Sequence, residues 1–282
     1  MKKKSKVIAI AAPTATGKSK LAVELAHKCN GEIISADSRL VYKGFNIAAA
    51  KPTIEEREGI PHFLIDIVEP EFDYSVANYV DDATVAIENI ISRGKTPIIV
   101  GGTGLYFRVL LEGYNIPRVA PNKELREELN KLSTEDLINR LKKIDKNYFN
   151  IVKEPEKRKL IRAIEVCETL DKPISELELN KEQPYEVEWI GINMPRTEIY
   201  DRINKRVDKM VELGIVDETK MLLNKHGRIP NFTETIGYRE LLPYLDGEYS
   251  LERAIELIKQ HSKNYAKRQL TWFRRNKELG IN

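Results

Sequence analysis

The chain has 282 residues, of which 41% are hydrophobic and 32% are charged, a composition that supports a buried core and excludes an extended disordered protein. The formal net charge of +3 is too small to mark the whole surface as one that binds nucleic acid or anionic membranes. The 2 cysteines lie far apart and the 4 histidines are scattered, which excludes a zinc-finger site and leads us to expect two reduced thiols.

Five short apolar runs predict the strands of a parallel sheet. They are rich in β-branched residues and lack polar alternation, as strands buried on both faces do. The amphipathic stretches 18–29 and 76–92 predict helices between them, so we expect an α/β fold with a P-loop core whose parallel sheet is flanked by helices. The apolar runs are residues 7–12, 32–36, 62–68, 96–102 and 188–194.

The basic start, MKKKSK, followed by an apolar run, resembles the beginning of a signal peptide. The run is only about seven residues long and leads directly into Gly17 and Lys18, so we interpret it as the first core strand. No apolar stretch approaches the roughly 20 residues that a membrane-spanning helix needs. We therefore expect a cytoplasmic protein with no membrane partner.

The middle of the chain has a charged, helical pattern that differs from the rest. Ser133 or Thr134 can cap a helix there, because serine and threonine accept hydrogen bonds from the first free backbone N–H groups. We expect residues 117–185 to form a helical insertion within a core made of residues 1–116 and 186–282.

Residues 13–19, PTATGKS, predict a loop that binds a phosphate or diphosphate. In the pattern G-x-x-x-x-G-K-[ST], backbone N–H groups surround phosphate oxygens at a helix start, the lysine adds a positive charge and the hydroxyl ligates magnesium. Ala12 replaces the first glycine, which costs ~1–2 kcal/mol only if this position needs a positive φ. If the loop bound a nucleoside triphosphate, an aspartate at a strand end, Asp37 or Asp66, would support the metal.

Residues 259–277 are rich in Lys and Arg, contain no Asp or Glu, and have helical periodicity. Tyr265, Arg268, Trp272 and Arg275 fall on one face, where basic groups suit phosphates and aromatic rings suit unpaired bases. The alternative is a terminal helix that packs its apolar side chains on the core and leaves its charges in solvent.

An ordered set of stretches resembles the tRNA dimethylallyltransferases, also called tRNA isopentenyltransferases. The stretches follow the family order from residue 7 to residue 275, which is nearly the whole chain. They are PTATGKS, EIISADSRLVYKGFNI with AKPT, GIPHFLIDIVEP with YSVANY, PIIVGGTGLYFRVLLEG, RINKRVDKMVELGIVDE, ETIGYREL and YAKRQLTWFR.

The resemblance implies transfer of the five-carbon dimethylallyl group from dimethylallyl diphosphate to N6 of the adenosine on the 3′ side of a tRNA anticodon. It implies that Asp37 is the general base and that Thr103 is a hydroxyl donor at the reacting centre. Lys18 and Mg²⁺, the latter held partly by Ser19, would neutralise charge on the departing diphosphate.

The resemblance also implies that the diphosphate binds along the whole phosphate loop. Arg206 is expected as a second clamp on the diphosphate, with Arg202 as its substitute. The loop residues expected to bind are Ala12, Pro13, Thr14, Ala15, Thr16, Gly17, Lys18 and Ser19.

The implied partner is the anticodon stem-loop of a tRNA, bound by a protein that we expect to be a monomer. The resemblance implies that the core is catalytic and contacts the target base, and that the helical insertion at 117–185 contacts the stem. The residues that carry over from the family are Asp37, Ser38, Arg39, Leu40, Thr103, Arg126, Arg158, Lys159, Arg162, Gly237, Tyr238, Arg239, Lys267, Arg268, Gln269, Trp272 and Arg274.

Several positions depart from the family pattern. Ala48 and Ala49 stand where Gly-Thr is usual, Arg39 and Leu40 stand where Met-Gln is common, and Lys159 replaces an arginine. The lysine loses the bidentate fork of a guanidinium, and the other changes bear on how the backbone and the base edge are contacted. None of them alters the three expected catalytic residues.

Three other functions fit parts of the pattern. A prenyltransferase acting on free adenine nucleotides would use the same loop, but a small acceptor needs neither the insertion nor the basic helix. A small-molecule kinase would bind ATP at the loop, but no arginine-rich lid is evident. A non-catalytic RNA-binding protein would retain the loop without its chemistry.

Overall fold

The computed structural model describes residues 4–281 apart from 154 and 181. The chain divides into two compact units, here called the core unit and the insertion unit. The core unit is Met1–Glu112 with Gln183–Asn282, and the insertion unit is Gly113–Glu182.

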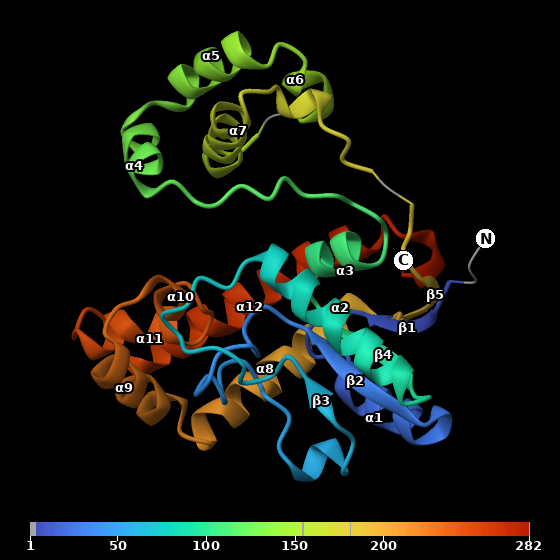
Figure 1. Ribbon diagram of the computed structural model, residues 1–282. Coiled ribbons are helices and arrows are strands. Elements are labelled where there is room, and N and C mark those ends of the chain that lie inside the picture. Colours follow the sequence, from blue (N-terminus) through green and yellow to red (C-terminus); the bar gives the residue numbers. More distant parts are fainter. Residues whose placement is uncertain (1–3, 154, 181, 282) are drawn as a thin grey trace. The chain divides into compact units, whose positions relative to one another are not determined.

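A five-stranded sheet lies at the centre of the core unit, and all of its pairings are parallel (Figure 1). The strand order is β3-β2-β4-β1-β5, and β1, β2 and β4 are almost completely buried. The parallel α/β architecture predicted from the apolar runs is confirmed. The strands are β1 (Lys6–Ala11), β2 (Gly31–Ala36), β3 (His62–Phe63), β4 (Thr96–Gly101) and β5 (Glu186–Gly191).

Two of the predicted strands are wrong in extent. The strand expected at 62–68 ends after Phe63, because Leu64 and Asp66 have left-handed φ values of 61° and 56°, which no regular strand accommodates. The strand expected at 188–194 lies earlier in the chain and is only partly buried, because β5 is an edge strand with a neighbour on one side.

Helices cover both faces of the sheet. α1 (Lys18–Cys29) packs on one face against β1, β2 and β4, and α2 (Val76–Ser92) packs on the other face against β2 and β4. Both helices have the predicted ranges, and Ser75 caps α2 with its side chain. α3 (Gly104–Leu110) follows β4 and packs on α2.

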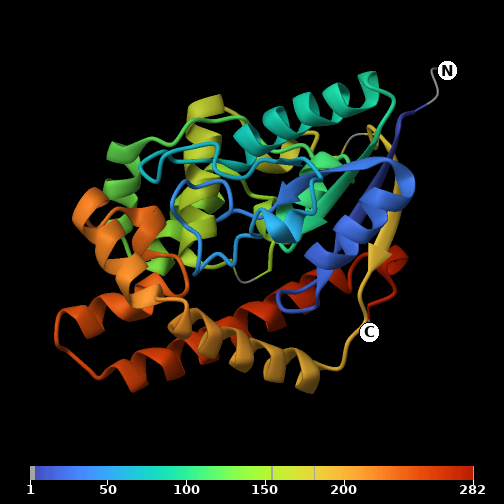
Figure 2. The ribbon, with the colours of Figure 1, turned by 90° about the horizontal axis from the view of Figure 1, so that it is seen from below.

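The carboxyl-terminal part of the core unit is helical, as its periodicity predicts. α12 is the longest of these helices and lies beside α8, as Figure 2 shows. No helix in the described parts of the chain is both long and apolar enough to cross a membrane. The helices are α8 (Arg196–Glu212), α9 (Ile215–His226), α10 (Pro230–Thr233), α11 (Tyr238–Leu245) and α12 (Leu251–Phe273), with short 3₁₀ turns η1 (Glu55–Arg57) and η3 (Lys277–Leu279) elsewhere in the unit.

The insertion unit has its own hydrophobic core, to which Leu129, Leu137 and Leu160 contribute. Ser133 caps α5 by accepting the backbone N–H of Asp136, so the predicted cap is confirmed. Both cysteines are free: Cys29 lies in the core unit and Cys167 is buried in the insertion unit. The elements of the insertion unit are α4 (Lys123–Lys131), α5 (Thr134–Ile144), α6 (Tyr148–Ile151), α7 (Lys157–Leu170) and η2 (Ile174–Glu176).

Candidate active site

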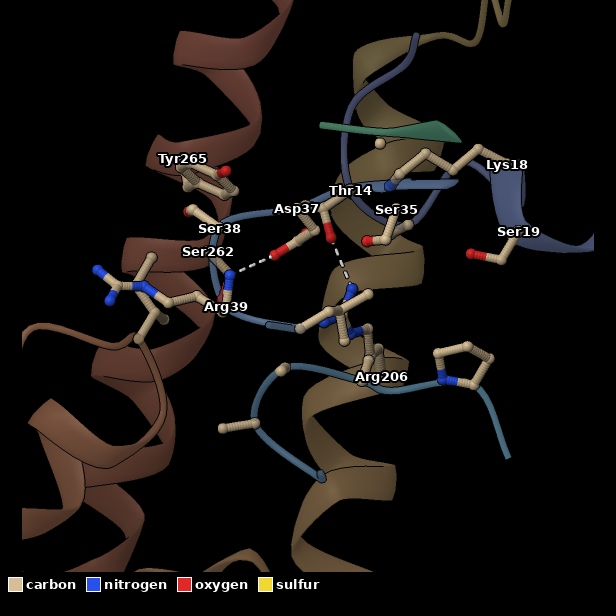
Figure 3. A pocket seen from close by; sticks show the side chains of 18 of the residues that line it. Thr14, Lys18, Ser19, Ser35, Asp37, Ser38, Arg39, Arg206, Ser262 and Tyr265 are labelled. Carbon is tan, nitrogen blue, oxygen red and sulfur yellow. Dashed lines mark hydrogen bonds between the residues drawn. The ribbon is translucent and has the colours of Figure 1, made fainter. Parts of the chain in front are cut away.

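A pocket with a volume of about 620 Å³ lies in the core unit at the carboxyl ends of the parallel strands (Figure 3). Its walls come from the loop after β1 with the start of α1, the loop after β2, the loop at 48–52, and one face each of α8 and α12. In open α/β sheets, ligands bind at this edge, because the strand ends leave a crevice between their loops.

The phosphate loop adopts its shape without a glycine at its first position. Ala12 is fully buried and does not have a positive φ, whereas Ala15 has φ 64° and Gly17 has φ 86°. The Thr16 hydroxyl closes the turn by donating a 2.8 Å hydrogen bond to the Pro13 carbonyl. Ala12 therefore carries no conformational penalty, and the strained residue of this loop is Ala15.

Two cationic side chains converge on the phosphate loop. The Lys18 ammonium donates to the Pro13 carbonyl at 3.3 Å, and the Arg206 guanidinium, from α8, donates to the Thr14 hydroxyl at 2.6 Å (Figure 3). Burial lowers the pKa of Lys18 to about 8, and Arg206 adds to this effect while Asp37 opposes it. Burial also lowers the pKa of Arg206. The loop thus concentrates positive charge that an anion would stabilise.

The two arginines expected as alternative clamps have different surroundings. Arg206 lines the pocket, whereas Arg202 is exposed and pairs with Glu198 of its own helix at 2.8 Å. Arg202 still lies at the rim, since its guanidinium would be 3.9 Å from a Cβ placed on Gly17.

Asp37 follows β2 directly and lines the pocket. One of its carboxylate oxygens accepts the backbone N–H of Arg39 at 2.8 Å, which orients the side chain (Figure 3). The other candidate aspartate, Asp66, does not line the pocket and forms an ion pair with Lys51. Of the two, only Asp37 is positioned to act on a ligand there.

Thr103, which directly precedes α3, does not itself line the pocket. Its hydroxyl accepts the backbone N–H of Ser38 at 3.3 Å, and its own backbone N–H donates to the Ala36 carbonyl at 3.2 Å. Tyr265 of α12 lines the pocket nearby, and burial raises its pKa to about 12, with Asp37 raising it further and Thr103 lowering it. Thr103 is therefore linked to the loop that carries Asp37 through Ser38.

The glycines around Thr103 are required by two close approaches. A Cβ on Gly101 would lie 2.1 Å from the Ala36 carbonyl oxygen, and a Cβ on Gly104 would lie 2.3 Å from the Trp272 ring. The stretch GGTG is thus explained by the packing of β2 and α12 against this backbone.

A buried carboxylate holds the loop that carries the unusual alanines. Glu218 of α9 accepts the backbone N–H of Ile47 at 2.9 Å and the Tyr238 hydroxyl at 2.7 Å. It also accepts the backbone N–H of Ala48 at 3.3 Å. Ala48 lines the pocket and adjoins Gly237, where an added Cβ would lie 2.9 Å from the Ala48 Cβ. The small residues at 48 and 237 therefore allow the two loops to touch.

The core-unit residues that the resemblance assigns to tRNA binding differ in their exposure and in whether they line the pocket. Tyr238 is fully buried, so its side chain is not available to an RNA, and Trp272 packs against the core. Lys267 and Arg274 are exposed. The assigned residues that line the pocket are Asp37, Ser38, Arg39, Leu40, Arg239, Arg268 and Gln269.

Four more of the assigned residues lie in the insertion unit. Arg126 and Arg162 pair with the buried Glu165 at 2.8 and 2.5 Å, whereas Arg158 and Lys159 are exposed. Although burial opposes it, hydrogen bonds from the two arginines lower the pKa of Glu165 to about 2. Arg126 thus joins α4 to α7, whereas the pair between Arg162 and Glu165 lies within α7. The two exposed cations are directed to solvent.

The apolar wall of the pocket and one serine in it were not predicted from the sequence. Ile203, Val207 and Met210 of α8 and Ile258 of α12 line the pocket, but their helical spacing is that of an ordinary core stripe. Ser35 also lines it, and its buried hydroxyl has no hydrogen-bond partner within the described part of the chain. In the sequence, the only indication that Ser35 belongs to the site is that it is a serine within an apolar strand.

Comparison with known proteins assigns the family. Residues 40–276 match the family model described as IPP transferase. The chain belongs to the IPP transferase family. One member, the tRNA dimethylallyltransferase of Pelotomaculum thermopropionicum, is 44% identical over 284 residues, which covers 98% of this chain and 90% of the relative.

Crystal structures of other IPP transferase family relatives have the same fold. A full-length tRNA isopentenylpyrophosphate transferase from Bacillus halodurans is 42% identical, with a TM-score of 0.73 over 99% of this chain and 89% of the other. A eukaryotic dimethylallyltransferase acting on tRNA is 30% identical, with a TM-score of 0.79 over 95% of this chain and 70% of the other. The family predicted from the motifs is confirmed.

Proposed function

We propose that this protein transfers the dimethylallyl group from dimethylallyl diphosphate to N6 of the adenosine on the 3′ side of the tRNA anticodon, releasing diphosphate. The relatives described above carry out prenyl transfer to tRNA according to their names, and the identity reaches 44% over nearly the whole chain. The observation that carries the proposal is the convergence of Asp37, Lys18 and Arg206 on one pocket.

Asp37 is the proposed general base. The exocyclic amine of adenine is a poor nucleophile, because its lone pair is delocalised into the ring. A carboxylate within hydrogen-bond reach takes the N6 proton as the new C–N bond forms. The hydrogen bond from the Arg39 backbone holds Asp37 in one orientation for this step.

Lys18 and Arg206 are the proposed charge-stabilising groups for the leaving diphosphate. When the bond between carbon and diphosphate oxygen breaks, the electron pair leaves with the diphosphate. The two cations then stabilise the negative charge of the diphosphate in a partly desolvated site. The wall formed by Ile203, Val207 and Met210 offers an apolar surface for the five-carbon group.

The oxygen donors around the phosphate loop suit Mg²⁺. The Ser19 hydroxyl lies at the start of α1, and Ser35 supplies a buried hydroxyl without a partner among the described residues. Those residues contain no group of three or more His, Cys, Asp or Glu side chains that could hold a metal, so most ligands would come from diphosphate and water, as is usual for Mg²⁺. When bound with Ser19 as a ligand, Mg²⁺ would neutralise charge on the diphosphate.

The proposed partner is the anticodon stem-loop of a tRNA. Arg39, Arg239 and Arg268 line the pocket and supply positive charge for the RNA backbone, while the target base must leave its stack to reach Asp37. We propose that Thr103 helps to position this base through Ser38. We also propose a monomer, because one chain supplies all of these residues, and a cytoplasmic location, where tRNA is available.

The two catalytic alternatives lack comparable support. A prenyltransferase for free nucleotides and a small-molecule kinase both use a phosphate loop, but the relatives are named for tRNA as the acceptor. The chain that these relatives match includes the insertion unit and α12, which a small acceptor does not require.

A transfer assay tests the proposal. The protein is incubated with radiolabelled dimethylallyl diphosphate, Mg²⁺ and bulk tRNA, and a parallel tube contains AMP in place of tRNA. We expect label in tRNA and its loss with Asp37→Asn. Label in AMP alone would favour the free-nucleotide enzyme, and absence of label from both tubes would reject prenyl transfer.

A further inference from the structure

The side chain of Gln269, on α12, joins two loops that are distant in the sequence. Its Oε1 accepts the backbone N–H of Thr14 at 2.9 Å, and its Nε2 donates to the Gly102 carbonyl at 2.8 Å. A backbone N–H can only donate and a carbonyl can only accept, so these partners fix the orientation of the amide. Gln269 is buried, with 5% of its surface exposed, so both hydrogen bonds are shielded from solvent.

Each loop held by this amide carries one side of the proposed chemistry. Thr14 belongs to the phosphate loop, and its hydroxyl accepts the hydrogen bond from Arg206. Gly102 precedes Thr103, whose hydroxyl accepts the Ser38 backbone N–H next to Asp37. The amide therefore links the diphosphate side of the pocket to the side that holds the general base.

The absence of a side chain at Gly102 leaves room for this amide. A Cβ on Gly102 would lie 2.1 Å from the Gln269 Nε2, a distance that no real Cβ contact has. Trp272, on the next turn of α12, covers Gly104 in the same way. α12 thus rests directly on the backbone around Thr103, and both polar atoms of the Gln269 side chain are already engaged there.

We infer that Gln269 is a positioning residue that sets the phosphate loop and the Thr103 loop relative to each other, instead of a residue that contacts tRNA. This inference rests on the proposed function, since it names how the same pocket holds its two substrates. Prenyl transfer needs the amine and the carbon of the donor within about 3–3.5 Å in the right orientation, and a displacement of about 1 Å can cost ~10²-fold in rate.

Replacement of the amide by a side chain of similar length tests the inference. Gln269→Met removes both hydrogen bonds, and Gln260→Met makes the same change at an exposed position of α12. We expect Gln269→Met to lower kcat by ~10- to 100-fold and to raise KM for dimethylallyl diphosphate by several-fold, while the Kd for tRNA stays within about twofold. Gln260→Met should match the wild type in all three.

A second variant disturbs the same contact from the other side. Gly102→Ala places a methyl group where the Gln269 amide lies, so it should reproduce the kinetic pattern of Gln269→Met. The double variant should lose no more activity than the more impaired single variant, because both substitutions disrupt the same contact between the Gln269 amide and the Gly102 backbone. Binding of inorganic pyrophosphate with Mg²⁺, measured by calorimetry, should weaken in both single variants.

The outcomes distinguish the positioning role of Gln269 from the proposed prenyl transfer. If the wild type transfers no prenyl group, the proposed function fails. If the wild type is active and Gln269→Met has an unchanged kcat, or loses tRNA affinity alone, the positioning role is overturned. Additive losses in the double variant, or failure of both single variants to fold, would likewise overturn it and leave a structural contact.

Discussion

The Arg206 guanidinium crosses from α8 to the Thr14 hydroxyl, to which it donates a 2.6 Å hydrogen bond. This contact places a partly buried cation at the phosphate loop, whereas Arg202 on the same helix is exposed and paired with Glu198. The two arginines therefore have different surroundings, although their residue type is the same.

Arg206→Gln should raise KM for dimethylallyl diphosphate by ~10- to 100-fold, since a hydrogen bond to a charged group is worth about 1.5–3 kcal/mol. Arg202→Gln should change KM by less than about threefold, because an exposed ion pair contributes little. Steady-state kinetics of both variants gives the comparison. Equal effects would contradict the assignment of Arg206 as the clamp.

Asp37→Asn should lower kcat by ~10²- to 10⁴-fold, the usual effect of losing a general base. The asparagine oxygen can still accept the Arg39 backbone N–H, so the loop should keep its shape and both substrates should bind with nearly unchanged Kd. Single-turnover transfer and separate binding measurements check this. A variant that turns over at the wild-type rate would remove Asp37 from its role.

The affinity for dimethylallyl diphosphate should depend on the charge of Lys18. Burial lowers the pKa of Lys18 to about 8, so the free protein carries this charge below pH 8 and loses it above. Binding of an anion favours the protonated form, and the Kd should therefore be constant below about pH 7 and rise above pH 8, by up to about tenfold per pH unit. Calorimetry between pH 6.5 and 9.5 measures this, and Lys18→Arg should show a flat profile.

The replacement of the first loop glycine by Ala12 should be harmless, and the strain should lie at Ala15. Ala12→Gly should destabilise the fold by about 1 kcal/mol, since it adds backbone freedom to the unfolded chain and removes a buried methyl group. Ala15→Gly should be neutral or mildly stabilising, because φ 64° suits glycine. Urea denaturation compares the two. The reverse order of stability would show that the strain lies at residue 12 and not at residue 15.

Exposed cations of α12 should contribute to tRNA binding through charge. Removing the whole helix is a poor test, because Ala266, Leu270 and Phe273 are buried in the core. Lys267→Gln leaves that packing intact and should weaken tRNA binding and reduce the slope of log K against log salt concentration by about one. Lys220→Gln, at an exposed position of α9, is the control, and equal slopes in both variants would exclude Lys267 from the RNA contact.

Local patterns predicted the elements whose signals are local. The tight turn before α1, the helices α1 and α2 and the Ser133 cap follow from spacing and residue type within a few positions, and the structure has each of them. The run at 62–68 looked like a strand because its residues are apolar, but backbone conformations of Leu64 and later residues end the strand after two positions. Apolar character alone does not report such a turn.

The rest of the site depends on contacts between distant segments, for which spacing gives no signal. The Gln269 amide meets partners 255 and 167 residues away, and Glu218 holds a loop 171 residues before it. Ile203, Val207 and Met210 have the periodicity of any core stripe, although they form a wall of the pocket. Only the fold shows which apolar stripe lines a pocket.

The position of α12 has a consequence for synthesis of the chain. The phosphate loop leaves the ribosome early, but Tyr265 and Gln269 of the pocket belong to the last long helix. A nascent chain that lacks α12 lacks both the α12 residues that line the pocket and the Gln269 hydrogen bonds to Thr14 and Gly102. It therefore cannot hold the two loops in place while translation continues. Premature termination before the end of α12, at Phe273, should therefore yield an inactive fragment instead of an enzyme of reduced activity.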